Sequence, residues 1–553
     1  MSKGKHGGPP ELSYTFKYVR RPGDLRFDVS LRFRGGRTGR TRIILPSEWA
    51  GQRELFDAVR LMPPRTRGVV IHDSRSPHRK IVSHRPNQSV TIKYQVRQNW
   101  AGGVTDFGQC YRPVLQEDYF HFIGEGFFVH PDRDDERPRL IELNWEGLPD
   151  GWALSHSFGA GRRSRIINKS LSQLRRAVYV GGDFRVKKIL VRGGRLYVAL
   201  RGRWNFPDRD FFGLAGKVVE AQRSFWGDDD FPYFLITLIR TSQPLGSFGG
   251  TGLTDSFATF ASTDEPVGLR LKHLLAHELF HAWNGGKIRP AQPEELLYWF
   301  TEGFTEYYTR LLLLRAGLIT LEEYFDDYNK AILDYYTSPL REAGNGRILR
   351  DYWRDDELRR IPYRRGDILA HNWNARVRVA SRGRHSLDDA MTDLFRAARE
   401  KGALLSPALV AELLGAYLKC GVRGDIKKHV ESGGLIPPHR SALGPVAELK
   451  AATVSKFDLG FEFAESGSRK CVGAVREGGP AFRAGLRSGQ QILGAQIFYG
   501  DPTKVVRLTV MDSRGRKDVQ FYPAGEKLRV PQYALPARAS EAEMAACRAW
   551  FGL

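Results

Sequence analysis

Two histidines with three residues between them could bind a metal ion. His277 and His281 stand in AHELFHAW, and apolar residues recur before them at helical spacing. Residues four apart lie on one face of a helix, about one turn from each other, so both imidazoles can reach the same ion. Neutral imidazole suits zinc, and Glu278 can reach a metal-bound water without binding the metal. Because this HExxH pattern is only moderately specific, an ordinary helix with polar residues is the alternative.

A second stretch, FTEGFTEYY, supplies the groups that such a site still needs. Glu302 follows His281 after twenty intervening residues, and Glu306 stands one turn later on the same predicted helix. A catalytic zinc site has three protein ligands, a fourth position open to water, and acceptors that hold the histidine tautomers. We therefore predict one Zn²⁺ per chain, bound by His277, His281 and Glu302. Glu306 is predicted to accept a hydrogen bond from a ligand histidine. His273 is predicted to support the site from behind the ligands or to be merely a polar helix residue, rather than a third imidazole ligand.

The two motifs together resemble those of the gluzincin metallopeptidases. HELFHAWN followed by WFTEGFTEYY is most similar to the glycyl aminopeptidase-type family, and the likeness extends through RRIPYRRGDILAHNWNARVRV and SLDDAMTDL. In that family a β-rich N-terminal region and a thermolysin-like domain precede a PDZ domain. The resemblance implies a multidomain α+β fold with a mainly helical catalytic domain. It also implies a zinc-dependent peptidase that acts on a peptide or protein substrate.

The resemblance also nominates Tyr363 as a catalytic residue. Related gluzincins carry Tyr-x-Lys-Gly before a helix, and their tyrosine hydroxyl donates to the oxyanion of the tetrahedral intermediate. This chain has Tyr363-Arg364-Arg365-Gly366, so arginine replaces lysine. Charge that develops on a carbonyl oxygen needs a positioned donor in any case. In the implied mechanism Glu278 takes a proton from the attacking water and passes it to the leaving amine. A packing role is the alternative for the tyrosine.

One expected feature of an aminopeptidase is missing. Aminopeptidases of the family have a GGLEH-like stretch on a strand edge, whose glutamate binds the free α-amine of the substrate. The corresponding stretch here is SFGGTGLTDSFATF, in which Gly249 and Gly250 match but Thr251 and Gly252 follow without a glutamate. Asp255 is a minority candidate for that role, because its side chain is shorter and its position is shifted. The choice between aminopeptidase and endopeptidase therefore stays open.

Patterns along the chain predict the elements that carry these residues. From Leu12 to Arg203, short β-branched and aromatic runs alternate with Gly, Pro, Asn and Asp, which indicates an all-β region. Helical periodicity dominates from about Val267 to Leu418. We expect a β-rich domain at 10–204, a thermolysin-like zinc peptidase domain at 205–440, a PDZ-like domain at 445–530 and a tail at 531–553. GGLIPPHRSALGP is expected to be the linker before the third domain.

The third domain resembles a PDZ domain. Asp458, Leu459, Gly460 and Phe461 match the loop whose backbone amides hold a peptide carboxylate, and GPAFRAGLRSGQQIL is typical of bacterial protease-associated versions. Such a domain captures the C-terminus of an extended peptide by adding it to a sheet edge. The alternative is a degenerate domain that only packs on the catalytic domain.

Composition limits the remaining possibilities. The chain has 553 residues and a formal net charge of +23, but acids are interspersed and no nucleic-acid-binding motif is present. The sequence therefore does not favour a nucleic-acid partner, and a peptide-binding former peptidase that acts through its PDZ domain is the main rival function. No apolar run could span a membrane or serve as a signal, so a cytoplasmic location is expected, or a periplasmic or secreted one if a signal was removed. The sequence gives no indication of oligomeric state.

Overall fold

The computed structural model divides into two compact units. It describes residues 8–104, 107–231, 233–241, 248–262, 266–418, 421–466, 469–513, 515–536 and 538–553. The described parts of 8–216, 229–241 and 248–262 form the strand-rich unit, and those of 217–228 and 266–553 form the helical unit. Helix α2 (Asp208–Trp226) passes from the first unit into the second.

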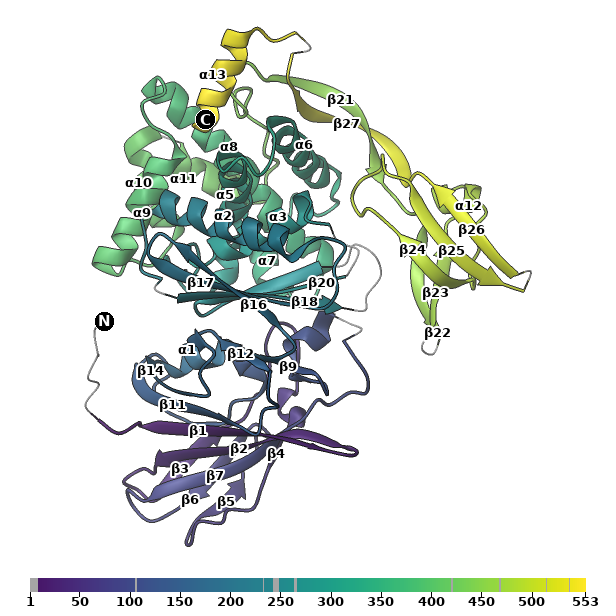
Figure 1. Cartoon of the computed structure of the whole chain (residues 1–553). Helices are drawn as coiled ribbons and strands as arrows, with labels where there is room; N and C mark the ends of the chain where they lie inside the picture. The colour runs from purple at the N-terminus through teal and green to yellow at the C-terminus, as the bar shows by residue number, and fades with distance from the viewer. Residues whose placement is uncertain are drawn as a thin grey trace. The chain divides into compact units, whose positions relative to one another are not determined.

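Four sheets make up the strand-rich unit (Figure 1). The first has the order β14-β11-β1-β2-β7-β4, with β1 (Leu12–Arg21), β2 (Asp24–Arg34), β4 (Val59–Leu61), β7 (Ser89–Val96), β11 (Arg139–Glu146) and β14 (Ser164–Lys169). The second has β10 (His130–Pro131), β3 (Arg40–Ile44), β6 (Arg79–Ser83) and β5 (Val70–Asp73). The third has β13 (Gly159–Ala160), β12 (Ala153–His156), β15 (Val178–Gly182), β9 (Tyr119–Ile123) and β8 (Val114–Leu115), and the short helix α1 (Leu171–Arg175) precedes β15.

Alternating side chains build the core of this unit. In β2, Phe27, Val29, Leu31 and Phe33 are all buried, as a strand with one face on the core requires. They join a large aromatic cluster to which the third sheet contributes, for example through the edge-to-face contact between Phe27 and Phe120, whose ring centroids are 5.0 Å apart. The predicted strand-rich character of this region is thus confirmed, although the short helix α1 lies within it.

The fourth sheet uses strands from beyond the predicted domain boundary. Its order is β16-β17-β18-β20-β19, with β16 (Arg185–Val191), β17 (Gly194–Arg201), β18 (Tyr233–Thr241), β19 (Phe248–Leu253) and β20 (Ser256–Ser262). β18 pairs in parallel with both β17 and β20, while β19 is an antiparallel edge strand. We expected 205–440 to be a separate domain, but β18 to β20 belong to the strand-rich unit, because their ladder continues from β17.

Helices dominate the second unit, as the periodicity predicts (Figure 1). They are α3 (Leu269–Phe280), α4 (Tyr298–Thr301), α5 (Gly303–Arg315), α6 (Leu321–Thr337), α7 (Asn345–Asp351), α8 (Asp356–Ser381), α9 (Leu387–Lys401), α10 (Pro407–Leu418) and α11 (Val422–Asp425). Local signals explain where several begin. Capping boxes start α6 at Thr320 with Glu323 and α9 at Ser386 with Asp389, and the Asp355 carboxylate caps α8.

Two glycines allow α8 to cross the start of α5 at very short range. A Cβ atom on Gly366 would lie 1.6 Å from the carbonyl oxygen of Trp299, and one on Gly303 would lie 2.3 Å from the Cα atom of Gly366. Only glycine fits at both positions, because either Cβ would overlap backbone atoms that cannot move aside. Gly303 follows Glu302 directly and Gly366 is three residues after Tyr363, so this crossing brings the two candidate site segments together.

The C-terminal part consists of a long hairpin, a small sheet and a final helix. The hairpin pairs β21 (Glu448–Phe457) with β27 (Ala524–Ala534). Between them lie β22 (Phe461–Ser466), β23 (Arg469–Val475), α12 (Pro480–Arg483), β24 (Gln491–Gln496), β25 (Val506–Asp512) and β26 (Gly515–Phe521). The five strands form one sheet in the order β22-β23-β24-β25-β26, which we call the C-terminal module (458–523) together with α12.

Two expectations for this region need correction. The segment 531–553 is not a tail, because β27 continues to Ala534 and helix α13 (Glu541–Phe551) packs back on the helical unit through Phe551. The stretch 433–445 is not a free linker either, because Ile436 and Leu443 are buried in the helical unit. Gly and Pro indicate irregular backbone, but they do not report whether that backbone packs against other elements. No helix in the described parts of the chain is both long and apolar enough to cross a membrane.

Candidate metal centre

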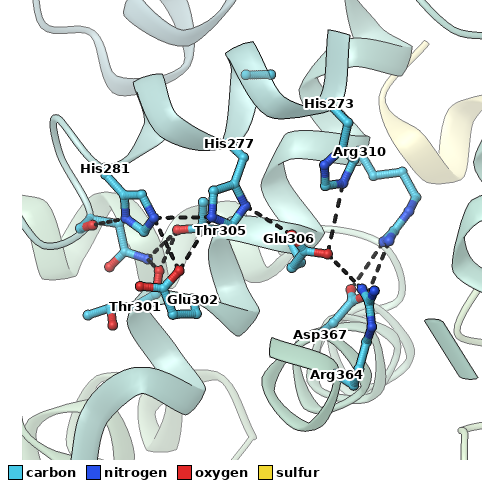
Figure 2. Close-up of polar contacts among 12 residues, drawn as sticks. His273, His277, His281, Thr301, Glu302, Thr305, Glu306, Arg310, Arg364 and Asp367 are labelled. Atoms are coloured by element: carbon cyan, nitrogen blue, oxygen red, sulfur yellow. Dashed lines mark hydrogen bonds and ion pairs between the residues drawn. The ribbon is translucent and has the colours of Figure 1, made fainter. Parts of the chain in front are cut away.

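Three side chains converge at the end of α3 and the junction of α4 and α5 (Figure 2). His277 lies in the last turn of α3 and His281 at its C-terminal cap, so the two rings share one face. Glu302 lies between α4 and α5 in helical conformation rather than inside a single helix, and Glu306 still follows one turn later. The Nε2 atoms of the two histidines are 3.2 Å apart, and they lie 3.3 and 3.2 Å from Glu302 Oε2.

These separations fit a zinc ion. A tetrahedral ion with bonds of about 2.0–2.2 Å holds its ligand atoms roughly 3.3–3.6 Å apart. The opposite ring nitrogens of both histidines already face acceptors. His277 Nδ1 lies 2.9 Å from Glu306 Oε1, and His281 Nδ1 lies 3.0 Å from the carbonyl oxygen of Asn284. With the proton on Nδ1, both Nε2 lone pairs point toward the Glu302 carboxylate, and a cation bound between them would stabilise this arrangement.

The electrostatics of the site lead to the same conclusion. Burial by itself lowers the pKa of His277, but Glu302 and Glu306 outweigh burial and raise this pKa to about 10. Burial raises the pKa of Glu302, while His281 and His277 more than compensate and bring it far below its ordinary range. The carboxylates thus create a strongly negative, buried environment around the imidazoles. Such an environment favours a bound positive charge.

Tyr363 lies against this cluster, as we expected. Its ring stacks on that of His277 with centroids 5.9 Å apart and planes at 11°. Burial and the nearby charges of Glu302 and Glu278 raise the pKa of Tyr363 well above its ordinary range, so the phenol keeps its proton. The one difference concerns its element: Tyr363 lies inside α8, which continues through Pro362, and not before a helix.

The arginines of the same motif have separate surroundings. Arg364 donates to Glu306 Oε2 at 2.9 Å and to Asp334 Oδ2 at 3.2 Å (Figure 2 shows the first contact). Arg365, at the position where related peptidases carry lysine, is fully buried. It donates to the carbonyl oxygens of Arg341 and Ala343 at 3.1 and 2.6 Å, and so holds the segment before α7. The substitution of lysine by arginine therefore leaves a packing residue at this position.

A wider charge network lies behind Glu306. Arg310, which is 1 % exposed, binds Asp327 through Nε at 2.8 Å. It also binds Asp367 through both terminal nitrogens at 3.1 and 3.2 Å (Figure 2). His273 is not part of the ligand cluster, and its Nε2 lies 3.9 Å from both Glu306 and Asp327. This position agrees with the prediction that His273 is a supporting or merely polar helix residue rather than a ligand.

Sequence patterns gave no indication that Asn284 serves the site. It is fully buried, and its side-chain amide donates to the carbonyl oxygen of Thr301 at 3.1 Å and to Thr305 Oγ1 at 3.0 Å. The main-chain carbonyl oxygen of Asn284 faces His281 Nδ1. Asn284 thus ties the end of the histidine helix to the segment that bears Glu302. The only signal in the sequence is its position just after HAW and before two glycines.

The candidate amine-binding residues lie in the strand-rich unit. Gly249 and Gly250 are on the edge strand β19 opposite Phe260 and Thr259 of β20. Asp255 is in the tight turn between these strands, with φ of +47°, and its carboxylate pairs with Lys169 Nζ at 2.8 Å. Its charge is therefore already compensated by a lysine.

The loop that resembles the PDZ carboxylate site uses some of its own amides. Asp458 N–H donates to the carbonyl oxygen of Pro523, and Gly460 N–H donates to Asp458 Oδ1 at 2.9 Å. Arg476 forms an ion pair with the same carboxylate. After Leu459, strand β22 begins at Phe461 and is an edge strand of its sheet. Among the described residues of 448–534, the four-residue α12 is the only α-helix, and it precedes β24.

Comparisons with known proteins agree with this geometry. Residues 270–346, which include both histidines and Glu302, match the family model of the M61 glycyl aminopeptidases. An aminopeptidase N family protein from Idiomarina loihiensis has a similar fold, with a TM-score of 0.73, 16 % identity, and coverage of 98 % of this chain and 100 % of that chain. An M1 zinc metallopeptidase from Deinococcus radiodurans is similar with a TM-score of 0.50 and 14 % identity, over 77 % of this chain and 95 % of that chain.

No curated protein gives a significant sequence match. The structural likenesses show a shared fold with a β-rich N-terminal region and a helical middle part. The family match covers the segment in which the histidine and glutamate donors converge. The predicted resemblance to the glycyl aminopeptidases is therefore confirmed over residues 270–346, and this match together with the donor cluster supports a zinc metallopeptidase.

Proposed function

We propose that the protein hydrolyses peptide bonds at a zinc ion held by His277, His281 and Glu302. The observation that carries this proposal is the convergence of the three donor atoms, which all lie within 4.8 Å of one another, beside the Tyr363 ring. A bound zinc ion would polarise a peptide carbonyl and lower the pKa of its bound water to about 7. Glu306 and the Asn284 carbonyl hold the two imidazoles in the tautomer that such binding needs.

Glu278 is the proposed general base. It follows His277 on α3 and is partly exposed, so it borders the cluster without joining the three donors. Its carboxylate takes a proton from the attacking water and passes it to the amine that leaves, so the same group acts first as base and then as acid.

Tyr363 is the proposed donor to the oxyanion. Its phenol remains protonated because burial and neighbouring carboxylates disfavour the phenolate. A neutral phenol beside the cluster can donate to the carbonyl oxygen as negative charge develops there. This interaction is strongest in the transition state, so it contributes to turnover more than to substrate binding.

We propose that the enzyme does not require a free N-terminus. Strand β19 has the sequence FGGTGL, without a carboxylate, and Asp255 is paired with Lys169. A specific site for an α-ammonium group needs an acidic partner, and the place where family aminopeptidases carry it has none. Peptides with blocked N-termini are therefore expected to be substrates.

For the C-terminal module we propose strand addition at β22 rather than capture of a carboxylate by the preceding loop. β22 is an edge strand, and Glu462 and Phe463 on it are exposed. The amides of Asp458 and Gly460 are already used inside the module, which leaves fewer donors for a carboxylate. An extended peptide can add to an edge strand through main-chain hydrogen bonds alone.

The test compares peptides that differ only at their N-termini. A peptide mixture, half with free and half with acetylated N-termini, is incubated with the purified full-length protein and with Glu278→Gln, and the cuts are mapped by mass spectrometry. We expect cuts in both halves, and background only with the variant, which should still bind zinc.

Three outcomes would change the proposal. Stepwise loss of residues from free N-termini alone would make the enzyme an aminopeptidase and return Asp255 to consideration. Equal activity of Glu278→Gln would refute the role of this residue as general base. The absence of cuts above background would favour a peptide-binding protein that acts through its C-terminal module.

A further inference from the structure

The carboxylate of Glu306 is held from two sides. Its Oε1 lies 2.9 Å from Nδ1 of His277, and its Oε2 accepts from Arg364 Nη1 at 2.9 Å (Figure 2). Glu306 is 7 % exposed. A buried carboxylate needs a partner for each oxygen. His277 contacts Oε1, and Arg364 supplies the donor for Oε2.

Arg364 is itself fixed at its far end. Its Nη2 donates to Asp334 Oδ2 at 3.2 Å, so one guanidinium joins Glu306 of α5 to Asp334 of α6. Arg364 comes from α8, where it directly follows Tyr363. The planar guanidinium group presents several N–H donors in a fixed geometry, which matches two carboxylates at set positions better than the single ammonium group of lysine does.

We propose that Arg364 is a positioning residue of the metal site, which fixes the Glu306 carboxylate so that it orients the ring of His277. Arg364 touches neither the metal ligands nor a substrate in this arrangement, and it acts through Glu306. Removal of Arg364 leaves Oε2 of Glu306 without its principal donor, and the carboxylate can then rotate away from Nδ1. The His277 ring loses the contact that aims its Nε2 at the other two donors. This inference rests on the ligand role of His277 and not on peptidase activity.

The loss of a group that orients a ligand histidine typically weakens metal binding by about 10- to 100-fold. We expect Arg364→Gln to fall in this range. Arg364→Lys should restore part of the affinity, because a single ammonium group lacks the two separate terminal nitrogens with which the guanidinium reaches Glu306 and Asp334. Asp334→Asn should weaken zinc binding less than Arg364→Gln, because it releases only the far end of the arginine.

The experiment measures zinc affinity of full-length variants by competition with a chromogenic chelator. A double-mutant cycle of Arg364→Gln with Glu306→Gln decides whether the arginine acts through the glutamate. If it does, Arg364→Gln costs much less affinity in the Glu306→Gln background than in the wild type. Arg376→Gln is the matched control, because Arg376 is on the same helix, has a side chain of similar exposure, and pairs with Asp425 away from the metal site. Its zinc affinity should equal that of the wild type.

Unfolding of every variant in excess chelator, followed by circular dichroism, separates an orienting role from loss of the fold. Wild-type zinc affinity in Arg364→Gln would overturn the proposal. An Arg364→Gln change that costs the same zinc affinity in the wild type and in the Glu306→Gln background would also overturn it. If Arg364→Lys loses as much zinc affinity as Arg364→Gln, the proposal is supported only when the double-mutant cycle shows that Arg364 and Glu306 are coupled. Zinc affinity is independent of turnover, so a protein that fails the peptide test can still pass this one.

Discussion

At the scale of single residues, the two imidazoles of the site are held by different kinds of acceptor. His277 faces the Glu306 carboxylate, which is itself fixed by Arg364, whereas His281 faces a main-chain carbonyl. A main-chain acceptor cannot rotate independently, so only the His277 side needs a further group to hold it. The His277 ring also carries the stacked phenol of Tyr363, whose contribution to turnover can be tested by substitution.

Tyr363→Phe is expected to lower kcat by about 10²–10³-fold with little change in KM, because the hydroxyl donates mainly to charge that exists in the transition state. Zinc content should be unchanged. The measurement is steady-state kinetics on an acetylated peptide. Tyr417→Phe is the control, since it also removes a phenol hydrogen bond, to Asp393, in the same unit. A rise in KM with an unaltered kcat would instead show that the phenol binds substrate.

At the scale of elements, the crossing of α8 over the start of α5 determines the site. Gly303 and Gly366 let the two backbones approach at the point between Glu302 and Tyr363. Glu302 therefore reaches the histidines from the junction of α4 and α5, while Tyr363 stacks on His277 from α8. The motif glycines are thus required by the contact between helices rather than by turns, because neither has a positive φ.

Gly366→Ala is expected to destabilise the helical unit by about 3 kcal/mol or more and to reduce zinc affinity, because the new Cβ overlaps the carbonyl oxygen of Trp299. Gly415→Ala in α10 is the matched control. A Cβ on Gly415 meets no atom within 4 Å, so this change should stabilise the protein by roughly 0.5–1 kcal/mol through helix propensity. Urea unfolding of both variants checks the prediction. The same change in unfolding free energy for both variants would contradict the prediction. So would a Gly366→Ala variant with wild-type stability and zinc affinity.

At the scale of the whole molecule, the C-terminal segment completes the helical unit. The Asn329 side chain of α6 forms hydrogen bonds with both main-chain groups of Tyr533, and the Phe551 carbonyl oxygen accepts from Arg315 of α5. The C-terminal module is inserted between the two strands of the hairpin, and those strands and α13 pack on the helical unit. The C-terminal module can therefore be removed while β21, β27 and α13 are kept.

Removal of all residues after Pro445 should destabilise the helical unit, because it takes away the packing of β27 and α13. Replacement of residues 458–523 by an Asn-Gly turn should be tolerated, because Phe457 and Ala524 are paired across the hairpin. If β22 captures substrate, the excised protein should cleave short peptides normally and long ones more slowly. Unfolding curves and kcat/KM for two peptide lengths provide the measurement. Equal rates for both lengths would assign the module a packing role.

Acid sensitivity is expected in the strand-rich unit. Burial lowers the pKa of His121 and of His156 to about 3, whereas histidine in an unfolded chain titrates near 6.5. The unfolded state thus binds more protons, so stability is complete above about pH 6.5 and decreases as the pH falls toward 3. Each histidine should account for about 2 kcal/mol of loss at pH 5. His121→Phe should remove the part of the stability loss at pH 5 that His121 causes. The measurement is urea unfolding at pH 7.5 and 5 in excess chelator. An unchanged pH dependence would contradict the assignment.

The candidate metal ligands could be nominated from the sequence. His277 and His281 are four residues apart and Glu302 and Glu306 are also four residues apart, so each pair follows from the geometry of one helical segment. The family resemblance then joined the two pairs and added Tyr363. In the same way, local alternation and periodicity indicated the strands of the first half and the helices of the second. These are all short-range patterns, which a single chain displays directly.

Tertiary structure alone decided which distant residues support the site. Arg364 and Glu306 are 58 residues apart, and Asn284 contacts Thr305 over 21 residues. The assignment of β18 to β20 to the strand-rich unit and the return of α13 also depend on pairing and burial between remote segments. No local periodicity records such contacts, because their free energy arises only when the chain has folded and both partners are desolvated together.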